Sequence, residues 1–187
     1  MSPDQSHGLA APDPRYPIGP FTLASDGVPP SPAEFESALD ALAQLPQLLR
    51  AAVTDLNDQQ LATPYRDGGW TIRQLVHHIA DSHMTAYLRI RLALTEDWPL
   101  INGYNEQAYA RLYDSQTAPV DWSLTTLDGL HARLVMVLRS LTPEQLQRGF
   151  VHSENGRMTL ELTTLAYAWH SRHHLAHITS LRRARGW

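Results

Sequence analysis

The chain has 187 residues, a net charge of −4 and no cysteine. This length fits one domain, the mildly acidic balance argues against nucleic acid or a membrane as the main partner, and the lack of cysteine excludes disulfides and thiolate metal ligands. The sequence has no apolar run of the roughly 18 residues that a transmembrane helix needs, and its Pro-rich start does not resemble a signal peptide. We therefore expect a cytoplasmic protein in which a metal site would use histidine and carboxylate.

The first predicted element is a helix. The stretch Ser31-Pro32-Ala33-Glu34 is typical of a capping box with proline at the first helical position. Apolar residues then recur at helical spacing as far as Val53, and Pro46 is expected to kink or split this helix. Residues 1–30 are polar and rich in proline, so we expect an extended, poorly ordered segment there. The predicted folded domain spans residues 31–187.

Three further long helices are predicted. A second capping box, Thr71-Ile72-Arg73-Gln74, begins a helix that continues for about six turns. Residues 96–121 contain proline and glycine, which favours a long crossover with one short helix near residues 106–113. Amphipathic patterns predict the last two long helices over about residues 123–141 and 159–183. Four long amphipathic helices indicate an all-α four-helix bundle.

A short internal similarity relates the two halves of the chain. The sequence Leu56-Asn57-Asp58-Gln59-Gln60-Leu61 resembles Leu141-Thr142-Pro143-Glu144-Gln145-Leu146. Each is followed by an aromatic residue, a glycine-containing loop and the start of a long helix. Strand alternation is confined to the second loop, around residues 150–152. The similarity predicts two related helix pairs, in which the second and last helices are counterparts, and both of these helices carry clustered histidines.

The last predicted helix holds four histidines within eight residues, His170, His173, His174 and His177. Residues four apart share a helix face, so His170/His174 and His173/His177 are two pairs that could each bind a metal ion, as in the H-E-x-x-H arrangement. His170 and His174 lie on the stripe of residues that a bundle helix presents to its neighbours. The second pair also has apolar neighbours, so the pattern favours the first pair and leaves the second open.

A catalytic zinc site usually has three protein ligands and a water molecule, and the second helix offers three histidines. His77 lies among polar residues on a face that we expect to be solvated, whereas His83 is expected to be packed or hydrogen-bonded in the core. His78 has small neighbours that leave room beside a core-facing ligand, and it is the preferred partner of His170 and His174. Three isolated histidines are not assigned to the site: His7, His131 and His152.

Two other polar positions have alternative interpretations. Arg66 and Asp67, in a glycine turn before the second helix, can pair with each other, or Arg66 can hold an anionic substrate group at the open end of the bundle. Asp81 follows His78 by three residues and could orient a ligand ring, but a solvent-facing aspartate explains it equally well. The sequence contains no His-Glu-x-x-His or G-x-S-x-G motif, so the catalytic residues are not assigned.

Taken together, these motifs resemble the DinB/YfiT-like superfamily, and in particular its YfiT branch of metal-dependent hydrolases. The resemblance extends over nearly the whole chain. It is carried by Gly68-Gly69-Trp70-Thr71, by His78 eight residues after the tryptophan, by His170-x-x-x-His174 and by the closing Gly186-Trp187. It implies a four-helix bundle with a long crossover, one divalent metal ion per subunit held by His78, His170 and His174, and a homodimer.

The predicted function is metal-dependent hydrolysis of a small-molecule substrate. A divalent ion on three neutral imidazoles, Zn²⁺ first and Ni²⁺ as an alternative, can lower the pKa of a bound water molecule toward about 7. The same open position can hold a thiolate for attack on an electrophile, and a related branch of the family transfers low-molecular-weight thiols such as bacillithiol. A thiol S-transferase is therefore the alternative, and a non-catalytic, metal-stabilised bundle is the second alternative.

Overall fold

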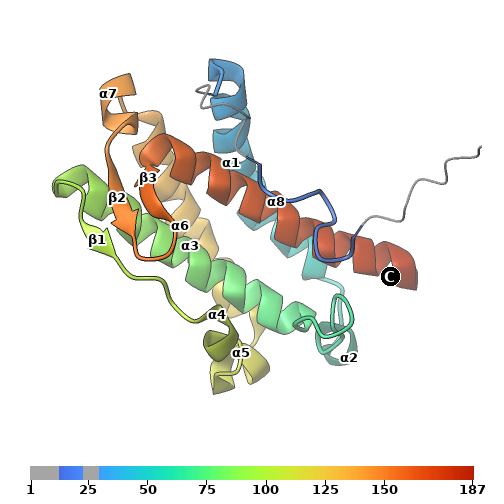
Figure 1. The fold of residues 1–187 in the computed structure, drawn as a ribbon. Coiled ribbons are helices and arrows are strands. Elements are labelled where there is room, and N and C mark those ends of the chain that lie inside the picture. Colours follow the sequence, from blue (N-terminus) through green and yellow to red (C-terminus); the bar gives the residue numbers. More distant parts are fainter. Residues whose placement is uncertain (1–12, 23–29) are drawn as a thin grey trace, which may run out of the picture.

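A computed structural model describes residues 13–22 and 30–187. His7 lies outside the described residues, as does most of the segment expected to be poorly ordered. Four long helices make up the body of the structure (Figure 1): α1 (Pro32–Val53), α3 (Ile72–Thr95), α6 (Val120–Arg139) and α8 (Leu160–Arg185). The predicted four-helix bundle is confirmed. Among the described helices, none combines the length and the apolar character that crossing a membrane requires.

The long helices pack so that consecutive helices are not always neighbours in space. α1 packs on α6 and α8, and α3 packs on the same two helices. α1 and α3 therefore lie on one diagonal of the bundle, and α6 and α8 lie on the other. The predicted metal ligands come from α3 and α8, which are adjacent, so the topology brings together two helices that are far apart in sequence.

Capping boxes define the starts of α1 and α3, as predicted. The side chains of Ser31 and Thr71 accept hydrogen bonds from the backbone of Glu34 and Gln74, whose side chains bond back to the cap residues. The prediction that Pro46 could split the first helix was wrong, because α1 continues through it to Val53. Buried leucines precede and follow the proline, and their packing against the neighbouring helices offsets the missing hydrogen bond.

Short elements precede α3 and α8 in the same order. α2 (Asp58–Leu61) and α7 (Pro143–Leu146) both begin with capping boxes. After α2, Pro64 and Thr71 form an isolated antiparallel bridge. After α7, β2 (Gly149–His152) and β3 (Gly156–Thr159) form an antiparallel hairpin, as the strand signal around residues 150–152 suggested. This equivalence is consistent with the internal similarity of the sequence.

The crossover between α3 and α6 is more structured than predicted. It contains β1 (Leu100–Ile101), which pairs in parallel with β2, and then α4 (Glu106–Tyr109) and α5 (Tyr113–Thr117). The single short helix predicted near residues 106–113 is wrong, because the backbone is extended at Leu112 and the chain starts a new helix there. α6 starts three residues earlier than predicted, directly after the extended Pro119.

The core consists of two apolar clusters with a polar layer between them. One cluster includes Leu49, Leu75 and Leu127, and the other includes Leu39 and Phe150. Along α3, α6 and α8 these clusters are separated by five inward-facing histidines, listed here in chain order: His78, His83, His131, His170 and His174. Polar groups at such positions require partners, so this layer is where a ligand is to be expected.

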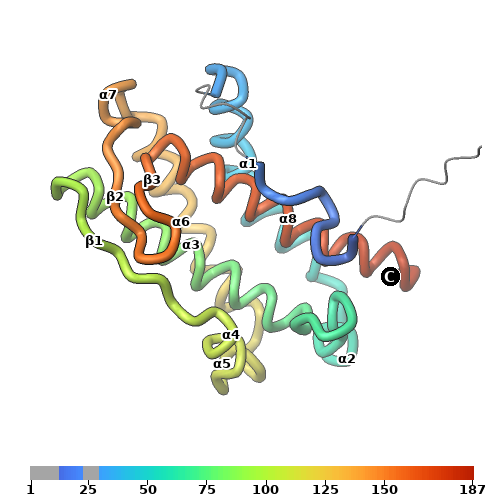
Figure 2. The backbone as a smooth tube through the Cα atoms, viewed as in Figure 1, coloured from blue at the N-terminus to red at the C-terminus, as the bar shows by residue number. Residues whose placement is uncertain are grey.

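The described part of the N-terminal segment, residues 13–22, lies along α8 (Figure 2). The indole Nε1 of Trp169 donates a hydrogen bond to the carbonyl oxygen of Gly19 at 3.2 Å. Phe21 packs on the same indole with ring centroids 5.9 Å apart. These contacts place the segment beside the histidine-bearing face of α8.

Candidate metal centre

The structure brings together the three histidines predicted to bind metal. His78 projects from α3, and His170 and His174 project from successive turns of α8. One ring nitrogen of each lies within 4.8 Å of the other two. The Nε2 atoms of His78 and His170 are 3.2 Å apart. His78 and His174 are buried and His170 is partly buried, so the group lies in the interior between the two helices.

The donor set fits a divalent metal ion. Burial lowers the pKa of His78 to about 4 and lowers those of His170 and His174 well below their usual value. The rings are therefore neutral at pH 7, and their lone pairs are available to a metal. Two nitrogens that each lie about 2.0–2.1 Å from a tetrahedral zinc are separated by about 3.3 Å. The observed separation of 3.2 Å between two of the rings is close to that value.

A fourth histidine, His83, contacts the His170 ring of this group. Its Nε2 lies 3.3 Å from Nδ1 of His170. If His170 presents Nε2 to a metal ion, its Nδ1 carries the proton and donates it to His83, which fixes the orientation of the ligand ring. His83 is fully buried and stacks on His131, whose Nδ1 donates to the backbone carbonyl of Leu42 at 2.6 Å. His83 is therefore the buried core histidine that the sequence predicted, with a positioning contact that the sequence did not reveal.

His77 differs from its prediction. Instead of a solvated position, it is buried with 7% exposure. Its Nδ1 accepts a hydrogen bond from the Ser123 hydroxyl at 2.8 Å, and its Nε2 donates to the Ala118 carbonyl at 3.2 Å. The crossover and the start of α6 cover this face of α3, which the local sequence of α3 could not show. Because both ring nitrogens form hydrogen bonds, His77 links α3 to the end of the crossover and the start of α6.

A cavity of about 310 Å³ opens above the predicted ligands. Trp70 forms one wall, with its ring 4.6 Å from that of His78 and its Nε1 donating to Gln107 at 3.1 Å. Arg66 lines the cavity, and its guanidinium donates to the backbone carbonyl of Asp67 at 3.0 Å. The side chains of Arg66 and Asp67 are therefore not paired with each other in the structure, and Arg66 lies over the Tyr65 ring at the edge of the cavity.

The structure adds a carboxylate that the sequence analysis missed. Glu106, the first residue of α4, lines the same cavity as the three histidines. Burial raises the pKa of Glu106, and the nearby Arg89 opposes this effect. The only sequence signal was Asn105, whose side chain caps α4 by accepting a hydrogen bond from the backbone N–H of Ala108. That signal locates a helix start, but it does not show that the crossover folds back over the histidines.

Asp81 does not make the orienting contact to a predicted ligand that the sequence allowed. Burial, followed by the charge of Asp114, raises the pKa of Asp81 to about 6. Among the described residues, the hydrogen bonds of the three predicted ligands do not involve Asp81, and His83 makes the orienting contact instead. His152 does not line the cavity either. It belongs to β2, and its Nδ1 accepts a hydrogen bond from the backbone N–H of Glu154.

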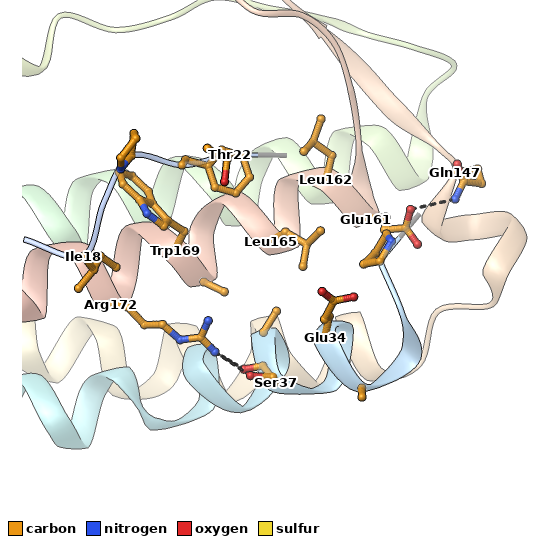
Figure 3. A pocket seen from close by; sticks show the side chains of 16 residues that line it. Ile18, Thr22, Glu34, Ser37, Gln147, Glu161, Leu162, Leu165, Trp169 and Arg172 are labelled. Carbon is orange, nitrogen blue, oxygen red and sulfur yellow. Dashed lines mark hydrogen bonds between the residues drawn. The ribbon is translucent and has the colours of Figure 1, made fainter. Parts of the chain in front are cut away.

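A larger cavity of about 790 Å³ lies between the N-terminal segment, the start of α1 and the outer face of α8 (Figure 3). Arg172 crosses it and donates to Ser37 of α1. None of the predicted ligands lines it. Thr22 and Pro30 also line it.

Comparison with known proteins places these features in a family. The family described as the DinB superfamily matches residues 11–178. A protein of Bacillus cereus strain B4264, named a "putative metal-dependent hydrolase", is 49% identical over 94% of this chain and 99% of its own. A protein of Oceanobacillus iheyensis with the same description is 44% identical over 92% of this chain and 98% of its own.

A solved structure shows the same arrangement of helices. It is YfiT from Bacillus subtilis, described as "a probable metal-dependent hydrolase with an unusual four-helix bundle topology". The two structures superpose with a TM-score of 0.88 at 46% sequence identity, over 93% of this chain and 98% of that one. The likeness therefore extends over both helices that carry the histidines.

Proposed function

Because this chain belongs to the DinB superfamily, we propose that it is a metal-dependent hydrolase that holds one Zn²⁺ on His78, His170 and His174. The observation that carries the proposal is the convergence of three neutral imidazoles, from two helices distant in sequence, at the floor of a cavity. The names given to relatives that align with nearly the whole chain also support it.

An ion held by His78, His170 and His174 would supply Lewis acidity, which lowers the pKa of a water molecule toward about 7. The residues of the chain supply the other functions. Glu106 is a carboxylate that lines the cavity. We assign to it the role of general base, which accepts the proton that the attacking water loses. Arg66 faces the same space with its permanent positive charge and is suited to bind an anionic group of the substrate. Trp70 covers the His78 ring and limits the access of bulk water.

Metal analysis combined with ligand variants tests this proposal. The purified chain is expected to bind one Zn²⁺ and to hydrolyse a compound from a panel of small esters, amides and lactones. His174→Ala should lose both the metal and the activity, and His78→Ala should lose the activity and bind Zn²⁺ more weakly. His152→Ala is the matched control, because it removes a buried histidine outside the cavity and should leave both unchanged. Unchanged Zn²⁺ affinity together with unchanged activity in His78→Ala would exclude this site.

A thiol S-transferase is the second candidate function. Arg66 at the cavity could bind the carboxylate of a small thiol cofactor such as bacillithiol, and the chain has no cysteine of its own to act as the nucleophile. Incubation of the zinc-loaded chain with an electrophile, with and without a low-molecular-weight thiol, separates the two reactions. Turnover that requires the thiol supports the transferase, whereas turnover in water alone supports the hydrolase.

The remaining alternative is a bundle that uses metal only for stability. Its signature would be a large fall in melting temperature on metal removal, together with no turnover in either assay. We also propose, from the family resemblance, that the chain is a cytoplasmic homodimer. Sedimentation equilibrium of the full chain tests the dimer, and fractionation of the source cells tests the location.

A further inference from the structure

Three histidines of α8 form a second group beside the predicted site. His173, His174 and His177 each place one ring nitrogen within 4.8 Å of the other two. The rings of His173 and His177 have centroids 4.4 Å apart, because residues four apart share a helix face. All three side chains are buried. The group shares His174 with the predicted site and lines the same cavity.

Several ring nitrogens of this group are buried without a hydrogen-bond partner of good geometry among the described residues. They are the Nδ1 atoms of His173 and His174 and the ring nitrogens of His177, whose ring also lies close enough to the backbone of Pro14 and Arg15 to interact with it. His77, in contrast, is equally buried and uses both of its nitrogens in hydrogen bonds. A buried polar atom without a partner costs folding free energy. Several such atoms in one group of neighbouring rings indicate a place for a ligand that accepts nitrogen lone pairs, which is what a cation does.

Aromatic side chains hold these rings in position. Trp169 stacks on His173 with centroids 4.4 Å apart and planes 19° apart. The ring centroids of Tyr65 and His177 are 4.1 Å apart. The ring centroid of Tyr16, in the N-terminal segment, lies 6.0 Å from that of His173. Rings held in this way lose little further rotamer freedom when a ligand binds, so the group is preorganised.

We propose that His173, His174 and His177 form an alternative position for a divalent cation that binds imidazole, next to the predicted site. A neutral imidazole offers one lone pair, so His174 serves one of the two positions at a time. Imidazole binds Zn²⁺, Ni²⁺ and Co²⁺. The charge of Arg66 faces His177, so this position should bind more weakly than the predicted site. The proposal does not depend on hydrolysis.

Titration of the metal-free full chain with Co²⁺, followed by its visible absorption, tests the alternative position directly. The variant His78→Ala/His170→Ala removes the predicted site and keeps the proposed group intact. This variant should still bind one Co²⁺ per chain, with a higher Kd than the unchanged chain. Adding His177→Ala should abolish the signal, whereas adding His152→Ala, a matched histidine loss outside the cavity, should leave it unchanged.

Absence of Co²⁺ binding by a folded His78→Ala/His170→Ala chain would overturn the proposal. Circular dichroism establishes that the variant is folded, and His78→Gln/His170→Gln replaces it if the alanine pair does not fold. The converse variant, His173→Ala/His177→Ala, keeps the predicted site. Its failure to bind Co²⁺ would count against the proposed function, so the two proposals fail in different variants.

Discussion

Replacing His83 tests whether a buried histidine positions a metal ligand. His83→Leu fills similar space but cannot accept the proton on Nδ1 of His170, which lies 3.3 Å away. An unsatisfied buried donor costs about 1–3 kcal/mol, and loss of an outer partner of a metal ligand weakens binding by about 10–100-fold. Since a tenfold change corresponds to about 1.4 kcal/mol, the two estimates agree. We expect the Kd for Zn²⁺ to rise by about 10–100-fold.

Competition between the protein and a chelating indicator measures this change. His83→Gln should restore most of the affinity, because its amide oxygen can occupy the place of Nε2 and accept the same hydrogen bond. His131→Leu is the matched control, since it replaces another histidine of the polar layer without removing the contact to His170. If folded His83→Leu binds Zn²⁺ as tightly as the unchanged chain, His83 does not position His170.

Four further predictions follow from the structure. The metal-free chain should lose stability as the pH falls from about 6.5 to 4, since the pKa of His78 is about 4 in the folded chain. Each such buried histidine contributes a slope of about 1.4 kcal/mol per pH unit to the free energy of unfolding. Equal urea midpoints at pH 7 and pH 5 would contradict this. Asp81→Asn should raise the urea midpoint above pH 6, because burial raises the pKa of Asp81 to about 6 and its charge is then unfavourable; an unchanged midpoint would show that the charge is well solvated. Glu106→Gln should lower kcat by about 10²–10⁴-fold with metal content unchanged, if Glu106 is the base; full activity would assign that role elsewhere. Phe150→Ala should destabilise the fold by about 3–5 kcal/mol, since its side chain is 2% exposed, and a urea midpoint near that of the unchanged chain would refute this packing.

Local signals in the sequence were sufficient for the starts of the helices and for the prediction that two histidines of α8 share one face. Capping boxes at Ser31 and Thr71 located two helix starts because the cap satisfies backbone donors within one turn. The spacing of His170 and His174 placed both rings on one face of a helix. The histidine on α3 could be chosen by its small neighbours, although the residues alone did not exclude the second pair on α8.

Features that depend on tertiary packing could not be predicted. His77 is covered by Ala118 at the end of the crossover and Ser123 of α6, which are 41 and 46 residues away in sequence. Glu106 reaches the cavity for the same reason, since the crossover folds back beside α3. Pro46 remains inside α1 because packing on both sides of it outweighs its local preference. In each case, the contacts that determine the structure join parts of the chain that are far apart in sequence. A local sequence pattern carries no information about such contacts.

Anomalous diffraction from crystals of the zinc-loaded chain tests the central claim most directly. The account predicts a strong zinc peak in contact with ring nitrogens of His78, His170 and His174, on the α3 and α8 walls of the cavity. A zinc-loaded crystal with no peak at these three histidines would contradict it.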